Sequence, residues 1–164
     1  MRPELCAWVP SNNTDKSGRP APLDGTNELV RQARGNALAA ARRKRINEQH
    51  VARHVAQAME DQGWVAPEGR SDVTLTFVEV SSRRDPDNIF GAAKYILDGL
   101  CTPVHTGRMG RRGKERIIHQ DGCSAIIDDS QAYVDLHMGI AEPDRQRPGV
   151  WVRIREKEEK HEEV

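Results

Sequence analysis

Two acidic motifs, well separated in the chain, offer the residue types of metal-dependent phosphate chemistry. Residues 83–88 read Arg-Arg-Asp-Pro-Asp-Asn, and residues 128–130 read Asp-Asp-Ser. Asp85 and Asp87 cannot share one face of a helix, but they can share a cation where a strand turns into a helix. A carboxylate from the second motif would complete a cluster of hard oxygen ligands, which suits Mg²⁺ or Mn²⁺ bound between protein carboxylates and a substrate phosphate. The two arginines indicate where that phosphate would lie.

Both motifs also have an interpretation without chemistry. Pro86 biases Asp85 towards an extended backbone and suits the first turn of a helix. Asp85 or Asp87 then lies at a helix N-terminus, where free N–H groups and the helix dipole stabilise an anion. The alternative for Asp128-Asp129-Ser130 is a turn before a strand.

Lys94 adds weight to the metal-site interpretation. It follows Asp87 by seven residues, nearly two helical turns, so both side chains project from one face of a helix. A lysine in this place could reach a phosphate or a leaving oxygen. The alternative is an i,i+4 ion pair with Asp98, which contributes little on a surface.

The elements that must position these residues indicate an α+β domain. A helical region runs from Thr26 towards Gly63, with a break at Gly35-Asn36, and a second helix begins near Asp85. The order β-α-β-α-β-β predicts a small mixed β-sheet that carries two main helices. Alternating apolar and polar residues predict strands at residues 73–80, 132–140 and 150–154, and a short segment that Pro10 ends is a further strand candidate at residues 5–9.

Length and composition indicate one soluble domain. The chain has 164 residues, which suits a single core over residues 1–155, followed by an acidic tail at residues 156–164 that is expected to be disordered. No apolar run is long enough for a membrane span or a signal peptide. Three cysteines argue against a disulfide framework and fit a reducing compartment. We therefore expect a cytoplasmic protein with no membrane partner.

The net charge of zero conceals an uneven distribution. The tail holds five acids and two lysines, which leaves 23 bases against 20 acids in residues 1–155. The bases cluster at residues 42–45, 83–84 and 108–116. Such local patches favour contact with nucleic-acid phosphates, whereas the alternative for any single run is a solvated surface of mixed charge.

Residues 101–125 form a long connection rich in Gly and Arg, with no sustained period. A tetrahedral Zn²⁺ site could hold the two ends of this insertion together. Its ligands would be Cys101, His105, His119 and Cys123. The alternative is a hairpin-like loop with Cys101 and Cys123 buried near its base. Between the two pairs, glycines are expected to prevent regular structure, so that the bases form an arm that follows DNA phosphates beside the acidic site.

Four segments of the chain resemble, in the right order, the RusA-type endodeoxyribonucleases, which are phage-associated Holliday junction resolvases. The segments are residues 8–13 (Trp-Val-Pro-Ser-Asn-Asn), 83–89 (Arg-Arg-Asp-Pro-Asp-Asn-Ile), 94–100 (Lys-Tyr-Ile-Leu-Asp-Gly-Leu) and 127–131 (Ile-Asp-Asp-Ser-Gln). The combination of Arg-Asp-x-Asp-Asn with a later Asp-Asp-Ser carries the resemblance, since neither half is specific alone.

The resemblance implies a RusA-like homodimer that binds four-way DNA junctions and nicks two strands symmetrically with Mg²⁺ or Mn²⁺. The family's essential aspartates fall on Asp85, Asp87 and Asp129, and its catalytic lysine falls on Lys94; Asp128 is a further candidate metal ligand. The implied reaction is attack of a metal-activated water on the phosphorus, with Lys94 stabilising charge on the transition state. Candidate DNA-contacting residues are Asn12, Asn13, Arg83, Arg84, Arg108, Arg111, Arg112 and Lys114.

The chain departs from the family pattern in three places. Lys94 lies nearly one helical turn further along than in the best-known members, Pro86 replaces a more usual aliphatic residue, and residues 101–125 are much longer than the family's connection. A non-catalytic protein of the same fold, or one directed at other branched DNA, is therefore the alternative function.

Overall fold

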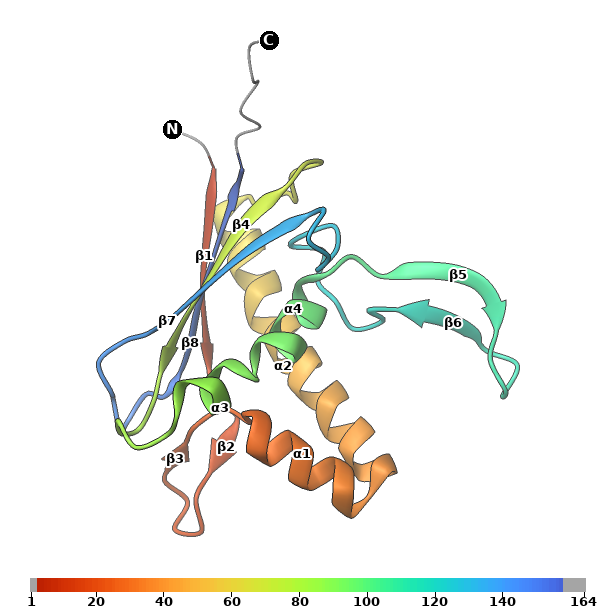
Figure 1. Cartoon of the computed structure of the whole chain (residues 1–164). Coiled ribbons are helices and arrows are strands. Elements are labelled where there is room, and N and C mark those ends of the chain that lie inside the picture. The colour runs from red at the N-terminus through yellow and green to blue at the C-terminus, as the bar shows by residue number, and fades with distance from the viewer. Residues whose placement is uncertain (1–2, 158–164) are drawn as a thin grey trace.

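Four strands form the main sheet, in which β8 and β4 are central. In the computed structural model, which describes residues 3–157, the strands lie in the order β1-β8-β4-β7 (Figure 1). β4 pairs in parallel with β7 and antiparallel with β8, and β1 pairs antiparallel with β8. Their bounds are Glu4–Pro10 (β1), Ser71–Val78 (β4), Val134–Ile140 (β7) and Gly149–Glu156 (β8).

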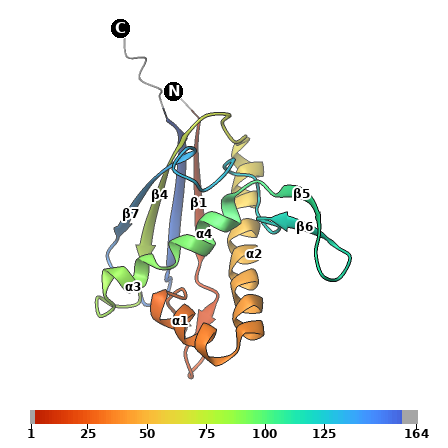
Figure 2. The same cartoon turned by 45° about the vertical axis from the view of Figure 1, so that its right-hand side comes forward.

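Helices cover one face of this sheet, and the alternation predicted from the sequence determines which face (Figure 2). Every second residue of β4 is buried, because Val73, Leu75 and Phe77 point towards the helices. Val51 of α2 and Ile96 of α4 pack against them and are themselves fully buried. The helices are Thr26–Gly35 (α1), Ala37–Gln62 (α2), Pro86–Phe90 (α3) and Ala93–Leu100 (α4).

Local signals set the helix ends. The predicted break at Gly35-Asn36 is confirmed: the Asn36 side chain accepts hydrogen bonds from Leu38 N and Ala39 N and caps α2. α2 ends at Gly63, which is left-handed with φ of 64°. The helix predicted to begin near Asp85 is two helices, α3 and α4, separated by a short turn.

The insertion is a β-hairpin, so the expectation that its glycines prevent regular structure is wrong. β5 (Val104–Met109) pairs antiparallel with β6 (Glu115–Ile118), and a register shift lies between His105 and Met109. Gly107 and Gly113 have φ of 67° and 69°, so they supply left-handed positions within the shifted register and the turn. The hairpin extends away from the sheet (Figure 1). Of the two cysteines that the hairpin alternative expects to be buried near its base, Cys101 is buried and Cys123 is partly buried.

The mixed sheet and its helices confirm the α+β class. A short pair that was not predicted, β2 (Asn13–Thr14) with β3 (Pro20–Ala21), lies in the polar loop after β1. β8 continues to Glu156, the first residue of the expected tail, and residues 158–164 lie outside the described residues. Within the described part of the chain, no helix is long and apolar enough to cross a membrane.

α4 approaches α2 closely at a glycine. A Cβ on Gly99 would lie 2.9 Å from Glu48 O and 3.1 Å from Val51 Cβ, so the two helices leave no room for a side chain. We therefore expect Gly99→Ala to lower the free energy of unfolding by about 1–3 kcal/mol in urea denaturation. Gly35→Ala is the matched control, since a Cβ there meets no atom within 4 Å. Equal stability of the two variants would contradict the close packing.

Candidate functional site

A buried carboxylate, Asp98, lies where three segments of the chain meet. It is 5% exposed and comes from the last turn of α4. Its oxygens lie 2.9 Å from Lys94 Nζ, 3.2 Å from Lys44 Nζ and 3.4 Å from His119 Nδ1. Lys44 belongs to α2 and His119 follows β6, so Asp98 joins α4 to α2 and to the end of the hairpin.

The second acidic motif joins this group through Lys94. Lys94 Nζ donates to Asp129 Oδ2 at 2.9 Å while it also donates to Asp98. His119 Nε2 lies 3.5 Å from Asp128 Oδ1 and 3.7 Å from Asp129 Oδ1. Lys94 and Asp129, predicted from the sequence to act together, are therefore in direct contact.

A group of four side chains with metal-binding atoms lies in the same place. Donor atoms of Cys101, His119, Asp128 and Asp129 all lie within 4.8 Å of one another. Of the four residues predicted to hold zinc, the structure brings only Cys101 and His119 into this group. His105 is absent because hairpin pairing places it on β5, where its Nδ1 lies 2.9 Å from Glu115 Oε2.

Burial and neighbouring charges set the protonation of this group. Burial opposes ionisation of Asp98, but hydrogen bonds and charge from Lys94 and Lys44 outweigh it and hold the pKa of Asp98 below its usual range. Burial raises the pKa of the Cys101 thiol, and Asp129, Asp128 and Asp98 raise it further. Cys101 is therefore a neutral thiol near pH 7.

A cavity of about 360 Å³ opens between α2, α4 and the segment after β6. Its walls include Lys44, Lys94, Asp98 and His119. Asp121, also on the wall, accepts hydrogen bonds from Arg45 Nε at 3.0 Å and Gln49 Nε2 at 3.1 Å, which ties this segment to α2.

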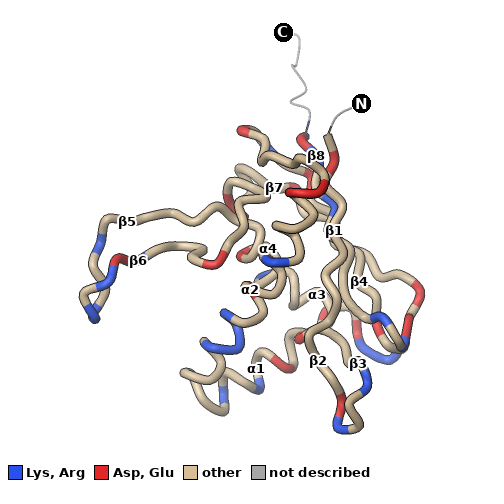
Figure 3. The backbone as a smooth tube through the Cα atoms, turned by 180° about the vertical axis from the view of Figure 1, so that it is seen from behind, with Lys and Arg blue, Asp and Glu red and all other residues tan. Residues whose placement is uncertain are grey.

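Basic residues flank the cavity on two sides. Figure 3 shows Lys and Arg at the tip of the β5–β6 hairpin and along the N-terminal half of α2. The predicted DNA-contacting residues of the tip are all exposed: Arg108, Arg111, Arg112 and Lys114.

The first acidic motif opens α3 as the sequence predicts, but the Asp85 side chain does not cap that helix. Asp85 occupies the N-cap position with an extended backbone, yet it makes no side-chain capping bond, and Pro86 follows at the first helical position. Asp85 and Asp87 are both exposed. Neither belongs to the group around Cys101, so the structure does not gather the four predicted Mg²⁺ ligands at one point.

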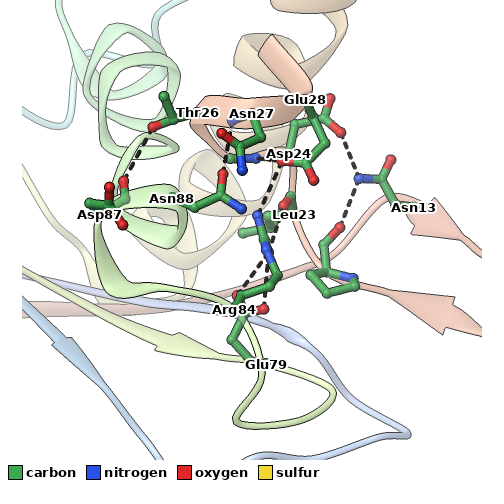
Figure 4. Close-up of polar contacts among 12 residues, drawn as sticks. Asn13, Leu23, Asp24, Thr26, Asn27, Glu28, Glu79, Arg84, Asp87 and Asn88 are labelled. Atoms are coloured by element: carbon green, nitrogen blue, oxygen red, sulfur yellow. Dashed lines mark hydrogen bonds and ion pairs between the residues drawn. The ribbon is translucent and has the colours of Figure 1, made fainter. Parts of the chain in front are cut away.

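Arg84, predicted to contact DNA, is engaged within the protein instead (Figure 4). Its Nη1 donates to Glu79 Oε2 at 2.9 Å and to Leu23 O at 3.2 Å, and its Nη2 donates to Glu28 Oε2 at 3.3 Å. Burial raises the pKa of Glu79, although the charge of Arg84 opposes the shift. Arg84 thus fixes the loop before α3 against the start of α1, while Arg83 stays exposed.

Asn12 and Asn13 belong to a polar network that holds the loop after β1 on α2. Asn12 Nδ2 donates to Asn47 Oδ1 at 3.1 Å, and Asn13 Nδ2 donates to Asp24 Oδ1 at 3.0 Å. Asp24, 5% exposed, also accepts from Arg43 Nε at 2.8 Å. The burial of Asp24 could not be predicted from the sequence, because its partners Asn13, Arg43 and Asn47 are distant in the chain and the neighbouring Leu23 and Gly25 do not indicate them.

Sequence reasoning also underrated Asp98 and did not connect His119 with the acidic motifs. The i,i+4 spacing from Lys94 to Asp98 predicted a weak surface pair, whereas burial of Asp98 makes it the centre of the site. His119 has a left-handed backbone with φ of 52°, which is uncommon for a residue other than glycine. The residues around His119 in the sequence do not predict this left-handed conformation.

Comparisons with known proteins found no match for the chain, whether with protein-family models, curated proteins or solved structures. The resemblance to RusA-type nucleases therefore stays a prediction that depends on its four segments.

The low pKa of Asp98 gives stability a defined pH dependence. Because the pKa is lower in the folded state than the unfolded value of about 3.9, the carboxylate stabilises the fold above that value. This stabilisation is lost as the pH falls through the folded pKa. We expect Asp98→Asn to lower the free energy of unfolding at pH 7 by about 1–3 kcal/mol. The difference from wild type should shrink below about pH 4.

The measurement is urea denaturation at a series of pH values. The exposed Asp61→Asn, at the end of α2, is the control and should change stability by less than about 0.5 kcal/mol. An Asp98→Asn variant as stable as wild type at pH 7 would show that Asp98 does not hold the three segments together.

Proposed function

We propose that the protein is a metal-dependent endonuclease that cleaves branched DNA, with four-way junctions as its substrate. The observation that carries the proposal is the 2.9 Å contact between Lys94 and Asp129. It holds the second acidic motif against α4, the helix that follows the short helix α3 that Asp85 and Asp87 open. Carboxylates and a lysine gathered beside exposed basic residues are the groups that hydrolysis of a phosphodiester requires.

The carboxylates of the two acidic motifs fit a hard cation. Asp85, Asp87, Asp128 and Asp129 offer oxygen donors, which Mg²⁺ and Mn²⁺ prefer. Mg²⁺ is often held by one or two carboxylates together with substrate phosphates, so its ligands need not be assembled before DNA binds. When bound, the ion would supply a polarised phosphate and an activated water.

Lys94 has the charge state that a transition-state stabiliser needs. Burial disfavours its ammonium form, but hydrogen bonds to Asp98 and Asp129 outweigh burial and raise the pKa of Lys94 above its usual value. Its side chain is 64% exposed, so it can leave Asp129 for a phosphate or a departing oxygen while Asp98 stays paired with Lys44. Asp98 thus acts as a positioning residue for Lys94.

Two copies of the chain, related by a two-fold axis, would place two such sites on a junction and nick two strands symmetrically. A non-catalytic branched-DNA-binding protein is the competing function. It is favoured by the position of Asp85 and Asp87 outside the group around Cys101. A cleavage assay distinguishes the two functions, because only the nuclease nicks the junction.

We expect Asp87→Asn to abolish nicking of a synthetic four-way junction in Mg²⁺ or Mn²⁺, while affinity for the junction persists. The reason is that the amide removes a negative charge from an exposed metal ligand without disturbing the core. Nicking is followed on denaturing gels and binding by fluorescence anisotropy, with Asp61→Asn as a control that cleaves at the wild-type rate.

Two outcomes would decide against this assignment. Cleavage by Asp87→Asn at the wild-type rate would remove Asp87 from the site. Tight junction binding by a wild-type protein that does not nick with either ion would establish the non-catalytic function instead.

The hairpin tip should contribute to junction binding through phosphates. Each phosphate contact contributes about 0.9 to the slope of log K against log salt. Changing all four basic residues of the tip to Gln should therefore weaken binding and reduce that slope by about 3–4. The altered residues are Arg108, Arg111, Arg112 and Lys114.

Arg153→Gln with Arg155→Gln is the matched control, because both arginines are exposed on β8, on the sheet face opposite the helices. An unchanged slope for the tip variant would show that the hairpin does not contact DNA.

A further inference from the structure

We propose that Cys101, His119, Asp128 and Asp129 form a binding site for a divalent transition metal of the Zn²⁺ class, at the root of the β5–β6 hairpin. The donor atoms of all four residues lie within 4.8 Å of one another. One sulfur, one imidazole nitrogen and two carboxylate oxygens are ligands that Zn²⁺ accepts in four-coordinate sites. A thiolate ligand selects against Mg²⁺ and Ca²⁺, which take oxygen ligands.

The distances suit one small ion. With ligands at about 2.0–2.3 Å from Zn²⁺, neighbouring donors in a tetrahedral site are about 3.3–3.8 Å apart. His119 Nε2 is already 3.5 Å from Asp128 Oδ1 and 3.7 Å from Asp129 Oδ1. Modest side-chain rotations would bring the remaining donors from within 4.8 Å to that separation.

The histidine is oriented as a metal ligand. Its Nε2 faces the two aspartates, while its Nδ1 lies 3.4 Å from Asp98 Oδ1. Metal-bound histidines almost always donate their second N–H to a carboxylate, a backbone carbonyl or water, which fixes the tautomer and the ring plane. Asp98 is buried and already placed for that role.

The net negative charge around these four residues also favours binding of a divalent cation. Four carboxylates converge with two ammonium groups, which leaves two negative charges when histidine is counted as neutral. Placing this excess in a partly buried site is costly without a counter-charge. The charged groups are Glu48, Asp98, Asp128 and Asp129 with Lys44 and Lys94.

The ligands come from positions that control the hairpin. Cys101 follows α4 directly and precedes β5, and His119 follows β6 directly. Close packing fixes this root, because a Cβ on Gly122 would lie 2.0 Å from Cys101 O. One ion would therefore join both ends of the hairpin to the segment that carries Asp128 and Asp129, and set the direction of the basic arm.

This site shares Asp128 and Asp129 with the proposed nuclease site, but metal binding does not require that the chain cuts DNA. The test uses the full chain, purified without a histidine tag and freed of metal with a chelator. Co²⁺ is added as a spectroscopic substitute for Zn²⁺, and zinc content is measured after dialysis. We expect one ion per chain and a thiolate-to-cobalt charge-transfer band that a large excess of Mg²⁺ leaves unchanged.

Four variants distinguish this site from one built of two cysteines and two histidines. Cys101→Ser should lose the band. His119→Gln should lower Zn²⁺ affinity by more than about 100-fold, since changing a residue behind a ligand already costs about 10–100-fold. His105→Gln and Cys123→Ser are the matched controls from the same hairpin flanks, and both should bind as wild type. Circular dichroism and a cooperative thermal transition without added metal show whether each variant is folded.

Absence of the band in folded wild-type protein would overturn the site. Loss of the band in Cys123→Ser or His105→Gln would also overturn it, in favour of a Cys101, His105, His119 and Cys123 set. Metal binding without any junction cleavage would refute the proposed nuclease and leave this inference intact.

Discussion

The candidate site depends on the charge of one buried carboxylate, Asp98. A buried carboxylate must be paired, and its partners Lys94, Lys44 and His119 come from three different segments. The close approach of α4 to α2 at Gly99 brings Asp98 within reach of Lys44. The same pairing fixes Lys94, which in turn holds Asp129. The packing of α4 on α2, the ion pairs of the site and the position of Lys94 therefore all depend on the burial and pairing of Asp98.

The acidic motifs have different physical characters, and this difference suggests how they divide the work. Asp85 and Asp87 are exposed oxygen donors at the start of α3, suited to an ion that arrives with a phosphate. Asp128 and Asp129 face a thiol and an imidazole, which favours a more firmly held transition metal. Arg84 and Asn13, expected to face DNA, instead stabilise the loops that place α1 against α3 and α2. The bases of the hairpin tip, by contrast, remain exposed.

Sequence patterns predicted what depends on local periodicity and capping. Alternation predicted β4, β7 and β8, and Gly35-Asn36 predicted the break between α1 and α2. Sequence patterns did not predict the features that depend on contacts between residues distant in the chain. The glycines of the insertion are typical of irregular structure, but Gly107 and Gly113 supply the left-handed positions that this hairpin needs. Asp98 and Asp24 are buried because segments distant in the chain pack around them. The residues next to each aspartate in the sequence do not indicate this packing. The residue types of the two acidic motifs and Lys94, together with the family resemblance, predicted the approach of Asp129 to Lys94.

The central claim is that the pair of Asp129 and Lys94 belongs to a centre that cleaves branched DNA. Single-turnover cleavage of a four-way junction by Asp129→Asn, with binding measured on the same sample, tests it most directly. The account predicts unchanged junction affinity and cleavage at least about 100-fold slower than wild type, because a metal ligand and a partner of Lys94 are lost together. Cleavage by Asp129→Asn at the wild-type rate would contradict it.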